Sequence, residues 1–163
     1  MPSARPPQQT DRLLAVLQDA GVDFVVIGGV AALAHGSATL TRDLDIAAPL
    51  SPENVERLMA ALRPYRPHHV TRPDLGPIQD SIERLCEFRL LLIDTDLGRL
   101  DVLSEVQPLG PASNLSAVEL ELLSGRMFRV LTLDQLIEVK AYLGRPKDRI
   151  VEVELRAIRD VRG

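Results

Sequence analysis

The chain has 163 residues, of which 45% are hydrophobic and 26% are charged, and these values are typical of one ordinary globular domain. Only 3% of the residues are aromatic, which argues against a protein that stacks single-stranded nucleic acid on aromatic side chains. The formal net charge of −4 argues against a protein that coats nucleic acid electrostatically. An enzyme that touches RNA through one local patch is still compatible with this composition.

The cysteine count and the apolar runs indicate a cellular compartment. The single cysteine, Cys86, can neither form an intramolecular disulfide nor supply a zinc site, which favours a reducing environment. The first ten residues contain no apolar signal-peptide core. The longest apolar run, residues 24–34, is much shorter than the about 20 residues that a membrane span needs. We therefore expect a cytoplasmic protein with no membrane partner.

The chain begins with a segment rich in Pro and Gln, residues 1–10, which we expect to be a disordered tail. Apolar spacing, capping residues and β-branched runs define the elements that come after it. They are a helix from Thr10 or Asp11 to Gly21, a strand over 23–27, a short helix over 30–35, a strand over 41–47 and a helix that begins at Ser51-Pro52.

The second half begins with residues 63–77, where four prolines predict a long surface loop. After it we expect a strand hairpin over 87–94 and 99–103, a second hairpin over 118–123 and 127–130, a helix from Thr132 to about 143 and a helix over about 147–160. These elements predict an α/β (α+β) fold, with a small mixed β-sheet, flanking helices and two helices at the C-terminal end. We interpret residues 11–163 as a single domain, with a core over about 22–130 and a helical part over about 131–163.

Two acidic residues on the strand predicted over 41–47 are candidate metal ligands. Asp43 and Asp45 are two residues apart, so both carboxylates project from one face of a strand, while Leu44 and Ile46 point into the core. Their Cα atoms would be roughly 6.5 Å apart, a spacing that lets two carboxylates hold a Mg²⁺ ion. Alternating acids also occur on solvated strand faces, so this pair alone does not establish a metal site.

A glycine pair precedes these acids. Gly28-Gly29 lies between the strand predicted over 23–27 and the following helix. Glycine at such a turn lets a phosphate chain approach the backbone N–H groups at a helix N-terminus.

A third acid, Asp101, lies among apolar residues on a separate predicted strand. If that strand runs beside residues 43–47, the three carboxylates converge at one edge of the sheet. Three acids, a metal site and a phosphate-binding turn are suited to phosphoryl transfer. In such a reaction Asp101 would accept the proton of the attacking hydroxyl.

Gly28-Gly29 followed by Asp43-Leu44-Asp45-Ile46 resembles the signature of the nucleotidyltransferase superfamily, and Asp101 matches its third carboxylate. The stretch from Leu131 to Asp148 is similar to the C-terminal helical motif of AbiEii-type bacterial nucleotidyltransferases, which include toxins of toxin–antitoxin systems. The resemblance covers about residues 22–155.

The resemblance implies a nucleotidyltransferase-like fold and the transfer of a nucleoside monophosphate from an NTP to an acceptor hydroxyl. It implies Mg²⁺ or Mn²⁺ as cofactor on Asp43, Asp45 and Asp101, and nucleotide binding by Gly28, Gly29, Thr41 and Lys140. The acceptor would be RNA, such as tRNA, or a protein, and an antitoxin protein would be a partner.

The sequence departs from the superfamily signature at one position and leaves two other functions open. Gly29 stands where the general signature has Ser, which removes one side-chain contact to phosphate. The same fold could serve as a non-catalytic module that binds nucleotide or docks a partner. It could also be an adenylyltransferase that modifies a small molecule such as an antibiotic. Lys140 has a simpler interpretation as a solvated helix residue, and Asp148 as a residue that links two helices.

Overall fold

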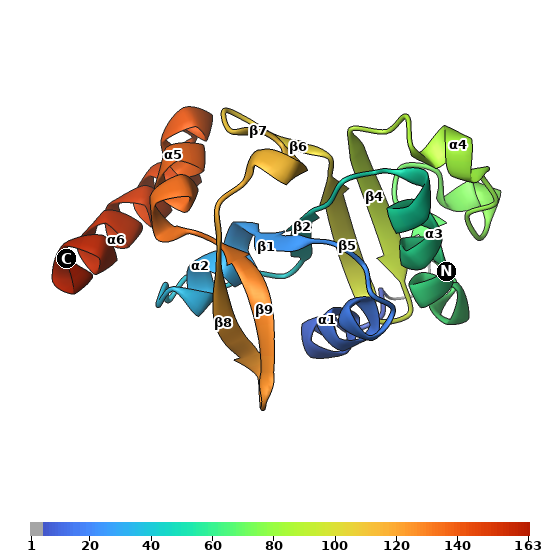
Figure 1. Ribbon diagram of the computed structural model, residues 1–163, viewed down its shortest axis with the longest axis horizontal. Helices are drawn as coiled ribbons and strands as arrows, with labels where there is room; N and C mark the ends of the chain where they lie inside the picture. The colour runs from blue at the N-terminus through green and yellow to red at the C-terminus, as the bar shows by residue number, and fades with distance from the viewer. Residues whose placement is uncertain (1–4) are drawn as a thin grey trace.

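The computed structural model describes residues 5–163 and contains a seven-stranded mixed sheet with helices at both ends (Figure 1). The strand order in the sheet is β3-β4-β5-β2-β1-β9-β8. The strands are β1 (Val25–Ile27), β2 (Leu44–Ala47), β3 (His68–His69), β4 (Leu90–Thr95), β5 (Gly98–Leu103), β8 (Ala117–Leu123) and β9 (Arg126–Leu131), and β6 (Glu105–Val106) pairs separately with β7 (Gly110–Pro111). The α-helices are α1 (Thr10–Asp19), α2 (Gly28–Ala34), α3 (Pro52–Leu62), α4 (Ile82–Leu85), α5 (Leu133–Leu143) and α6 (Pro146–Arg162).

The predicted fold class is confirmed, including the mixed sheet and the two C-terminal helices. Several predicted boundaries were wrong: the strand expected over 23–27 begins at Val25, and the helix expected over 30–35 begins at Gly28. The strand expected over 41–47 begins only at Leu44, and the strand expected over 87–94 begins at Leu90 because a short helix and a turn precede it. The loop expected over 63–77 contains β3, which pairs with β4 at the edge of the sheet.

The pairing of β1, β2 and β5 brings distant parts of the sequence together. Strand β2 runs parallel to β5, and Asp45 stands directly opposite Asp101. Strand β1 runs antiparallel to β2, and Ile27 stands opposite Asp45. Because Gly28 follows Ile27, the glycine pair comes beside the same carboxylate.

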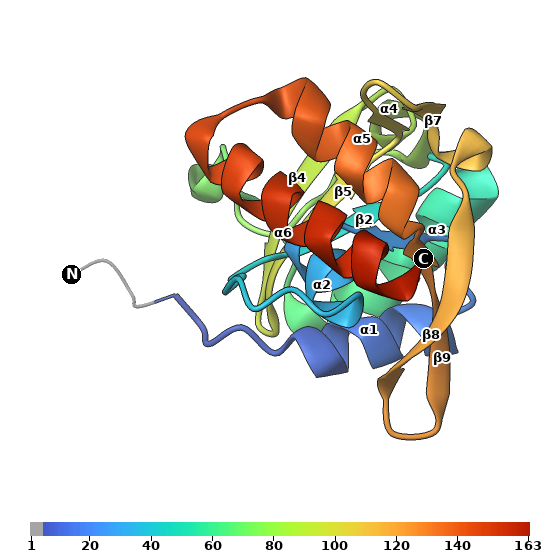
Figure 2. The same ribbon diagram turned by 90° about the vertical axis from the view of Figure 1, so that its left-hand side faces the viewer.

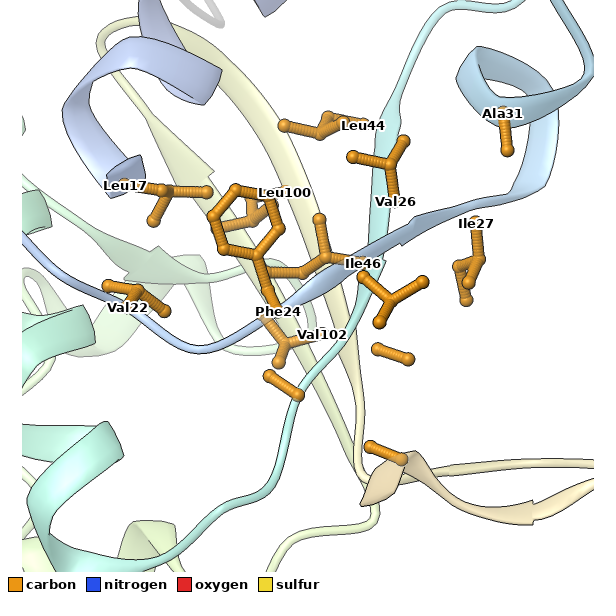
Figure 3. Packing of buried hydrophobic residues seen from close by; sticks show 14 of the residues in the cluster. Leu17, Val22, Phe24, Val26, Ile27, Ala31, Leu44, Ile46, Leu100 and Val102 are labelled. Carbon is orange, nitrogen blue, oxygen red and sulfur yellow. The ribbon is translucent and has the colours of Figure 1, made fainter. Parts of the chain in front are cut away.

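The hydrophobic core fixes β2 and β5 from one face. Leu44 and Ile46 on β2 and Leu100 and Val102 on β5 are fully buried, and they lie near Leu17 of α1 (Figure 3). Burial of each such side chain contributes about 1.5–3 kcal/mol. Since side chains alternate along a strand, Asp45 and Asp101 project from the opposite face and are held there by a rigid core.

The two C-terminal helices lie together over α2 (Figure 2). Helix α5 begins where the hydroxyl of Thr132 accepts a hydrogen bond from the backbone N–H of Gln135. It ends at Gly144, which adopts a positive φ of 62°, and Pro146 opens α6 at once. None of the helices among residues 5–163 combines the length and the apolar character that a membrane crossing requires.

The N-terminal segment is attached to the sheet before the predicted boundary at residue 10. The backbone N–H of Gln9 donates to the carbonyl of Leu97 at 2.8 Å, and Gln8 hydrogen-bonds to Arg99. Residues 1–4 of the predicted tail lie outside the described residues.

Candidate active site

Asp43, Asp45 and Asp101 form an acidic cluster at the junction of β2 and β5. Asp45 and Asp101 face each other across the parallel strand pair, whereas Asp43 lies in a bend just before β2. Burial, followed by the negative charges of Asp101 and Asp43 and a hydrogen bond with Asp101, raises the pKa of Asp45 to about 7. The charge of Lys140 opposes this rise only in part. Burial and the neighbouring carboxylates therefore both disfavour the ionised form of Asp45.

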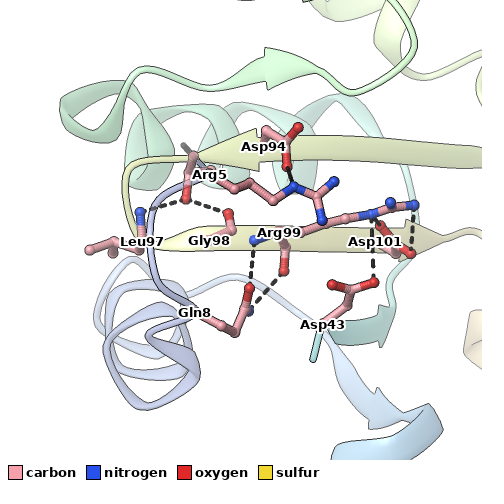
Figure 4. A network of polar contacts seen from close by, with 9 residues as sticks. Arg5, Gln8, Asp43, Asp94, Leu97, Gly98, Arg99 and Asp101 are labelled. Atoms are coloured by element: carbon pink, nitrogen blue, oxygen red, sulfur yellow. Dashed lines mark hydrogen bonds and ion pairs between the residues drawn. The ribbon is translucent and has the colours of Figure 1, made fainter. Parts of the chain in front are cut away.

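Arg99 of β5 lies between two members of the acidic cluster (Figure 4). Its Nε is 2.8 Å from Oδ1 of Asp101 and 3.8 Å from Oδ2 of Asp43. Arg99 was not among the predicted site residues, although its position two residues before Asp101 on a predicted strand already places both side chains on one face.

Among residues 5–163, no three His, Cys, Asp or Glu side chains converge closely enough to form a metal site. The three acids lie near one another, as expected, but they do not converge into a metal-binding group in this arrangement. Two features account for the difference. Asp43 precedes the strand instead of lying on it, and the guanidinium of Arg99 lies between Asp43 and Asp101.

Only glycine fits at positions 28 and 29, because neighbouring side chains occupy the space that a Cβ would need. Gly28 has a φ of +66°, and a Cβ on it would collide with the carboxylate of Asp45. A Cβ on Gly29 would lie 2.6 Å from the Cβ of Thr41. The side chain of Thr41 therefore occupies the space next to the position where the superfamily signature has Ser.

A cavity of about 270 Å³ adjoins the acidic cluster and gathers residues from three parts of the chain. It is lined by Gly28, Gly29, Ala32, Thr39, Leu40, Thr41, Asp45, Lys140, Arg145, Lys147, Asp148 and Val151. All four predicted nucleotide-binding residues are in this lining, together with one of the three predicted catalytic acids. Asp43 and Asp101 lie beside Asp45, outside the lining.

Lys140, Arg145 and Lys147 form a basic wall on the side of this cavity built by α5 and α6. Asp148 joins two of them: its carboxylate lies 3.4 Å from Nζ of Lys140 and 2.5 Å from Nε of Arg145. Only 1% of the Asp148 side chain is exposed. Burial raises the pKa of Asp148, but the hydrogen bond from Arg145 and the charge of Lys140 outweigh it and hold the pKa below its ordinary value. Asp148 thus links α5 to α6, as its simpler interpretation predicted, and the same contacts hold two cations at the cavity.

Glu154 of α6 anchors the loop that leads to Thr41 and Asp43. Its carboxylate accepts hydrogen bonds from the Ser37 hydroxyl at 2.5 Å and from the backbone N–H of Ala38 at 3.0 Å. These bonds lower the pKa of Glu154. No local sequence pattern indicates this contact, because its partners are more than a hundred positions apart.

No protein-family model matches the sequence, and no curated protein matches it significantly. Solved structures do match in three dimensions. A crystal structure of ANT(2'')-Ia in complex with adenylyl-2''-tobramycin has a TM-score of 0.54 and 17% identity, over 94% of this chain and 96% of that one. A solution structure of the antibiotic-resistance factor ANT(2'')-Ia has a TM-score of 0.56 and 17% identity, over 89% of this chain and 78% of that one.

The chain has a nucleotidyltransferase-like fold. This confirms the fold that the resemblance implied. At 17% identity the likeness is one of fold, and the chemistry has to be argued from the site itself.

Proposed function

We propose that the chain is a metal-dependent nucleotidyltransferase that moves a nucleoside monophosphate from an NTP to an acceptor hydroxyl. One observation carries the proposal: Asp45 stands beside Asp101 and lines a cavity whose other walls are a glycine pair and a basic wall. A triphosphate in this cavity would have carboxylates at one end and cations at the other.

The donor set fits a hard divalent cation. Asp45 is buried beside Asp101 and Asp43, which together raise its pKa, and carboxylate oxygens are the ligands that Mg²⁺ and Mn²⁺ prefer. Asp43, Asp45 and Asp101 would hold the ion. When bound, it would neutralise the triphosphate and support the departure of pyrophosphate.

The chain's own residues would bind the nucleotide and move the proton. Gly28 and Gly29 leave room for phosphate oxygens beside backbone N–H groups, and the hydroxyl of Thr41 offers one more donor. Lys140, on the basic wall, would pair with phosphate oxygens. The acceptor oxygen would attack the α-phosphorus, the bond to pyrophosphate would break, and Asp101 would take the proton of the acceptor hydroxyl.

A specific observation favours a small-molecule acceptor as one version of this activity. The solved ANT(2'')-Ia structure contains adenylyl-2''-tobramycin, an antibiotic that carries an adenylyl group. The net charge of −4 of the present chain would attract a cationic acceptor of that kind. RNA and protein acceptors rest on the resemblance to AbiEii-type enzymes.

The test is transfer of label from each α-labelled NTP, with Mg²⁺, to tobramycin, to a bacterial RNA pool and to a protein lysate. Asp45→Asn is compared with Asp160→Asn, a matched substitution at an exposed position on α6. Asp45→Asn should lower transfer by a factor of about a thousand or more, since a metal contributes several kcal/mol to the transition state. Asp160→Asn should leave it unchanged.

Full activity in Asp45→Asn would overturn the proposed role of this residue. Saturable NTP binding without transfer to any acceptor would favour the non-catalytic module. The toxin role implied by the resemblance makes a separate prediction. Expression of the wild-type chain should slow bacterial growth, expression of the Asp45→Asn variant should not, and an antitoxin partner should restore growth.

A further inference from the structure

Hydrogen bonds with Gln8 fix the backbone of Arg99, while more than one carboxylate lies near its side chain. The side-chain amide of Gln8 accepts a hydrogen bond from the backbone N–H of Arg99 at 2.8 Å and donates one to its carbonyl at 3.0 Å (Figure 4). This pair of bonds resembles the pairing of a neighbouring strand, and it occupies the place that β2 would fill if the strand began before Leu44. The backbone of Arg99 is therefore fixed at the end of the β2–β5 pairing, just before Leu100 meets Leu44.

In the present arrangement the guanidinium serves the acidic cluster. Besides the contacts of Nε to Asp101 and Asp43, Nη2 donates to Oδ2 of Asp101 at 3.4 Å. The Arg99 side chain is 22% exposed, so it is neither free in solvent nor sealed in the core. The guanidinium supplies a positive charge between the carboxylates of Asp43 and Asp101.

A second carboxylate lies within the same part of the sheet. Asp94 of β4 stands opposite Arg99 in the antiparallel register of β4 and β5. Asp94 contacts Arg5 at 3.8 Å, and both side chains are well exposed, at 36% and 58%. Such an exposed and distant ion pair is weak, so Asp94 can accept another cation at little cost.

We propose that Arg99 is a resident counter-cation of the acidic cluster: it neutralises Asp43 and Asp101 while no divalent cation is bound, and it moves to Asp94 when one binds. This inference rests on the proposed function, because it assumes that a divalent cation binds the cluster. It explains why these carboxylates do not converge in the present structure. It also makes metal binding a competition between the ion and a side chain of the same protein.

The experiment measures the affinity of the full chain for Mn²⁺ alone, from the electron paramagnetic resonance signal of free Mn²⁺. Arg99→Gln, which removes the competing charge, should bind Mn²⁺ about five- to tenfold more tightly than the wild type. Asp94→Asn, which removes the alternative partner, should bind it about two- to threefold more weakly. Arg66→Gln is the control, because Arg66 makes a comparable two-bonded pair with Asp96 at a different place in the molecule.

Two further variants and the outcomes of the measurement separate the role of Arg99 from the proposed function. The gain in Arg99→Gln should disappear when Asp101→Asn is added, which ties the effect to the cluster. Unchanged or weaker Mn²⁺ binding by folded Arg99→Gln, with wild-type binding intact, would overturn the role of Arg99 and leave the proposed function standing. An absence of Mn²⁺ binding in both chains would overturn both. Arg99→Lys, which keeps the charge, should bind Mn²⁺ close to the wild-type affinity if the side-chain charge is what competes, even where Arg99→Gln folds poorly.

Discussion

Two aspartates line the same cavity and differ in their electrostatic state. Asp45, on the sheet, lies among other carboxylates, and its pKa is raised to about 7. Asp148, on α6, is held by Lys140 and Arg145, and its pKa is lowered. Asp148 belongs to a completed ion cluster, whereas at Asp45 burial and two acidic neighbours outweigh the charge of Lys140. A residue whose charge is left unbalanced by its own protein is a candidate for binding a ligand of the opposite charge.

The largest expected effect comes from breaking the completed cluster. Asp148→Asn leaves Lys140 and Arg145 without their shared carboxylate and should lower the free energy of unfolding by about 2–3 kcal/mol at pH 7. Because the pKa of Asp148 is lowered in the folded state, the ionised carboxylate stabilises the fold above its unfolded pKa, and this contribution is lost as the pH falls. The difference in unfolding free energy between the wild type and Asp148→Asn should therefore become smaller as the pH is lowered.

Urea unfolding of Asp148→Asn between pH 4 and pH 8 checks this prediction. Asp134→Asn is the matched control, since Asp134 pairs with Arg159 at 3.4 Å but is 73% exposed, and its loss should cost less than about 1 kcal/mol. Equal losses in the two variants would mean that Asp148 contributes no more than a surface ion pair.

The pH dependence of stability that Asp45 contributes is expected to be opposite to that of Asp148. A carboxyl whose pKa is raised in the folded state stabilises the fold fully below its unfolded pKa of 3.8, and this contribution is lost as the pH rises to about 7. Asp45→Asn removes the unfavourable ionisation, so without metal it should be more stable than the wild type at pH 8. The gap should close toward pH 4.

The same unfolding series, performed in a chelator, measures this effect. Added Mg²⁺ should then stabilise the wild type and leave Asp45→Asn unchanged, because only the wild type offers the full acidic cluster. A variant that is less stable than the wild type at pH 8 would show that Asp45 contributes to the fold as an ion.

The smallest expected effect tests whether the close contact between Gly28 and Asp45 matters for stability and activity. Gly28 and Gly21 have similar positive φ values of 66° and 73°, but only at Gly28 would a Cβ meet the carboxylate of Asp45, whereas nothing lies near Gly21. Each alanine substitution should cost about 1–2 kcal/mol for the backbone conformation. Gly28→Ala should cost about 1 kcal/mol more, because Asp45 must leave its rotamer.

Thermal unfolding of the two alanine variants gives this difference, and the transfer assay gives a second measure. Gly28→Ala should lose nucleotidyl transfer, and Gly21→Ala should retain it. Equal activity in both would mean that the position of Asp45 does not matter for the reaction.

Much of the site could be predicted because its residues lie in local patterns. The alternation from Asp43 to Ile46 predicted which side chains are buried, and an apolar strand around Asp101 predicted a second strand that indeed lies beside the first. The glycine pair and Lys140 were placed by the resemblance, and all line the same cavity. Their functional roles remain predictions.

The residues that were missed act over long sequence separations. Gln8 contacts Arg99, and Glu154 contacts Ser37, through side-chain hydrogen bonds that leave no periodic signal in the sequence. Strand β3 was missed because it consists of only two histidines in a proline-rich segment. The bend at Asp43 was also missed, because the alternation of polar and apolar residues continues through Asp43 although the strand begins only at Leu44.

The residues that line the cavity come from both early and late parts of the chain, from Gly28 to Val151, so the cavity is completed late in synthesis. A growing chain on the ribosome acquires its acidic cluster and glycine pair well before α6, so the basic wall is the last part of the site to form. A proteolytic cut beside the exposed Arg145, between α5 and α6, would divide that wall while every strand of the sheet stayed continuous. The complete cavity thus requires that α6 has been synthesised and that the segment between α5 and α6 is intact.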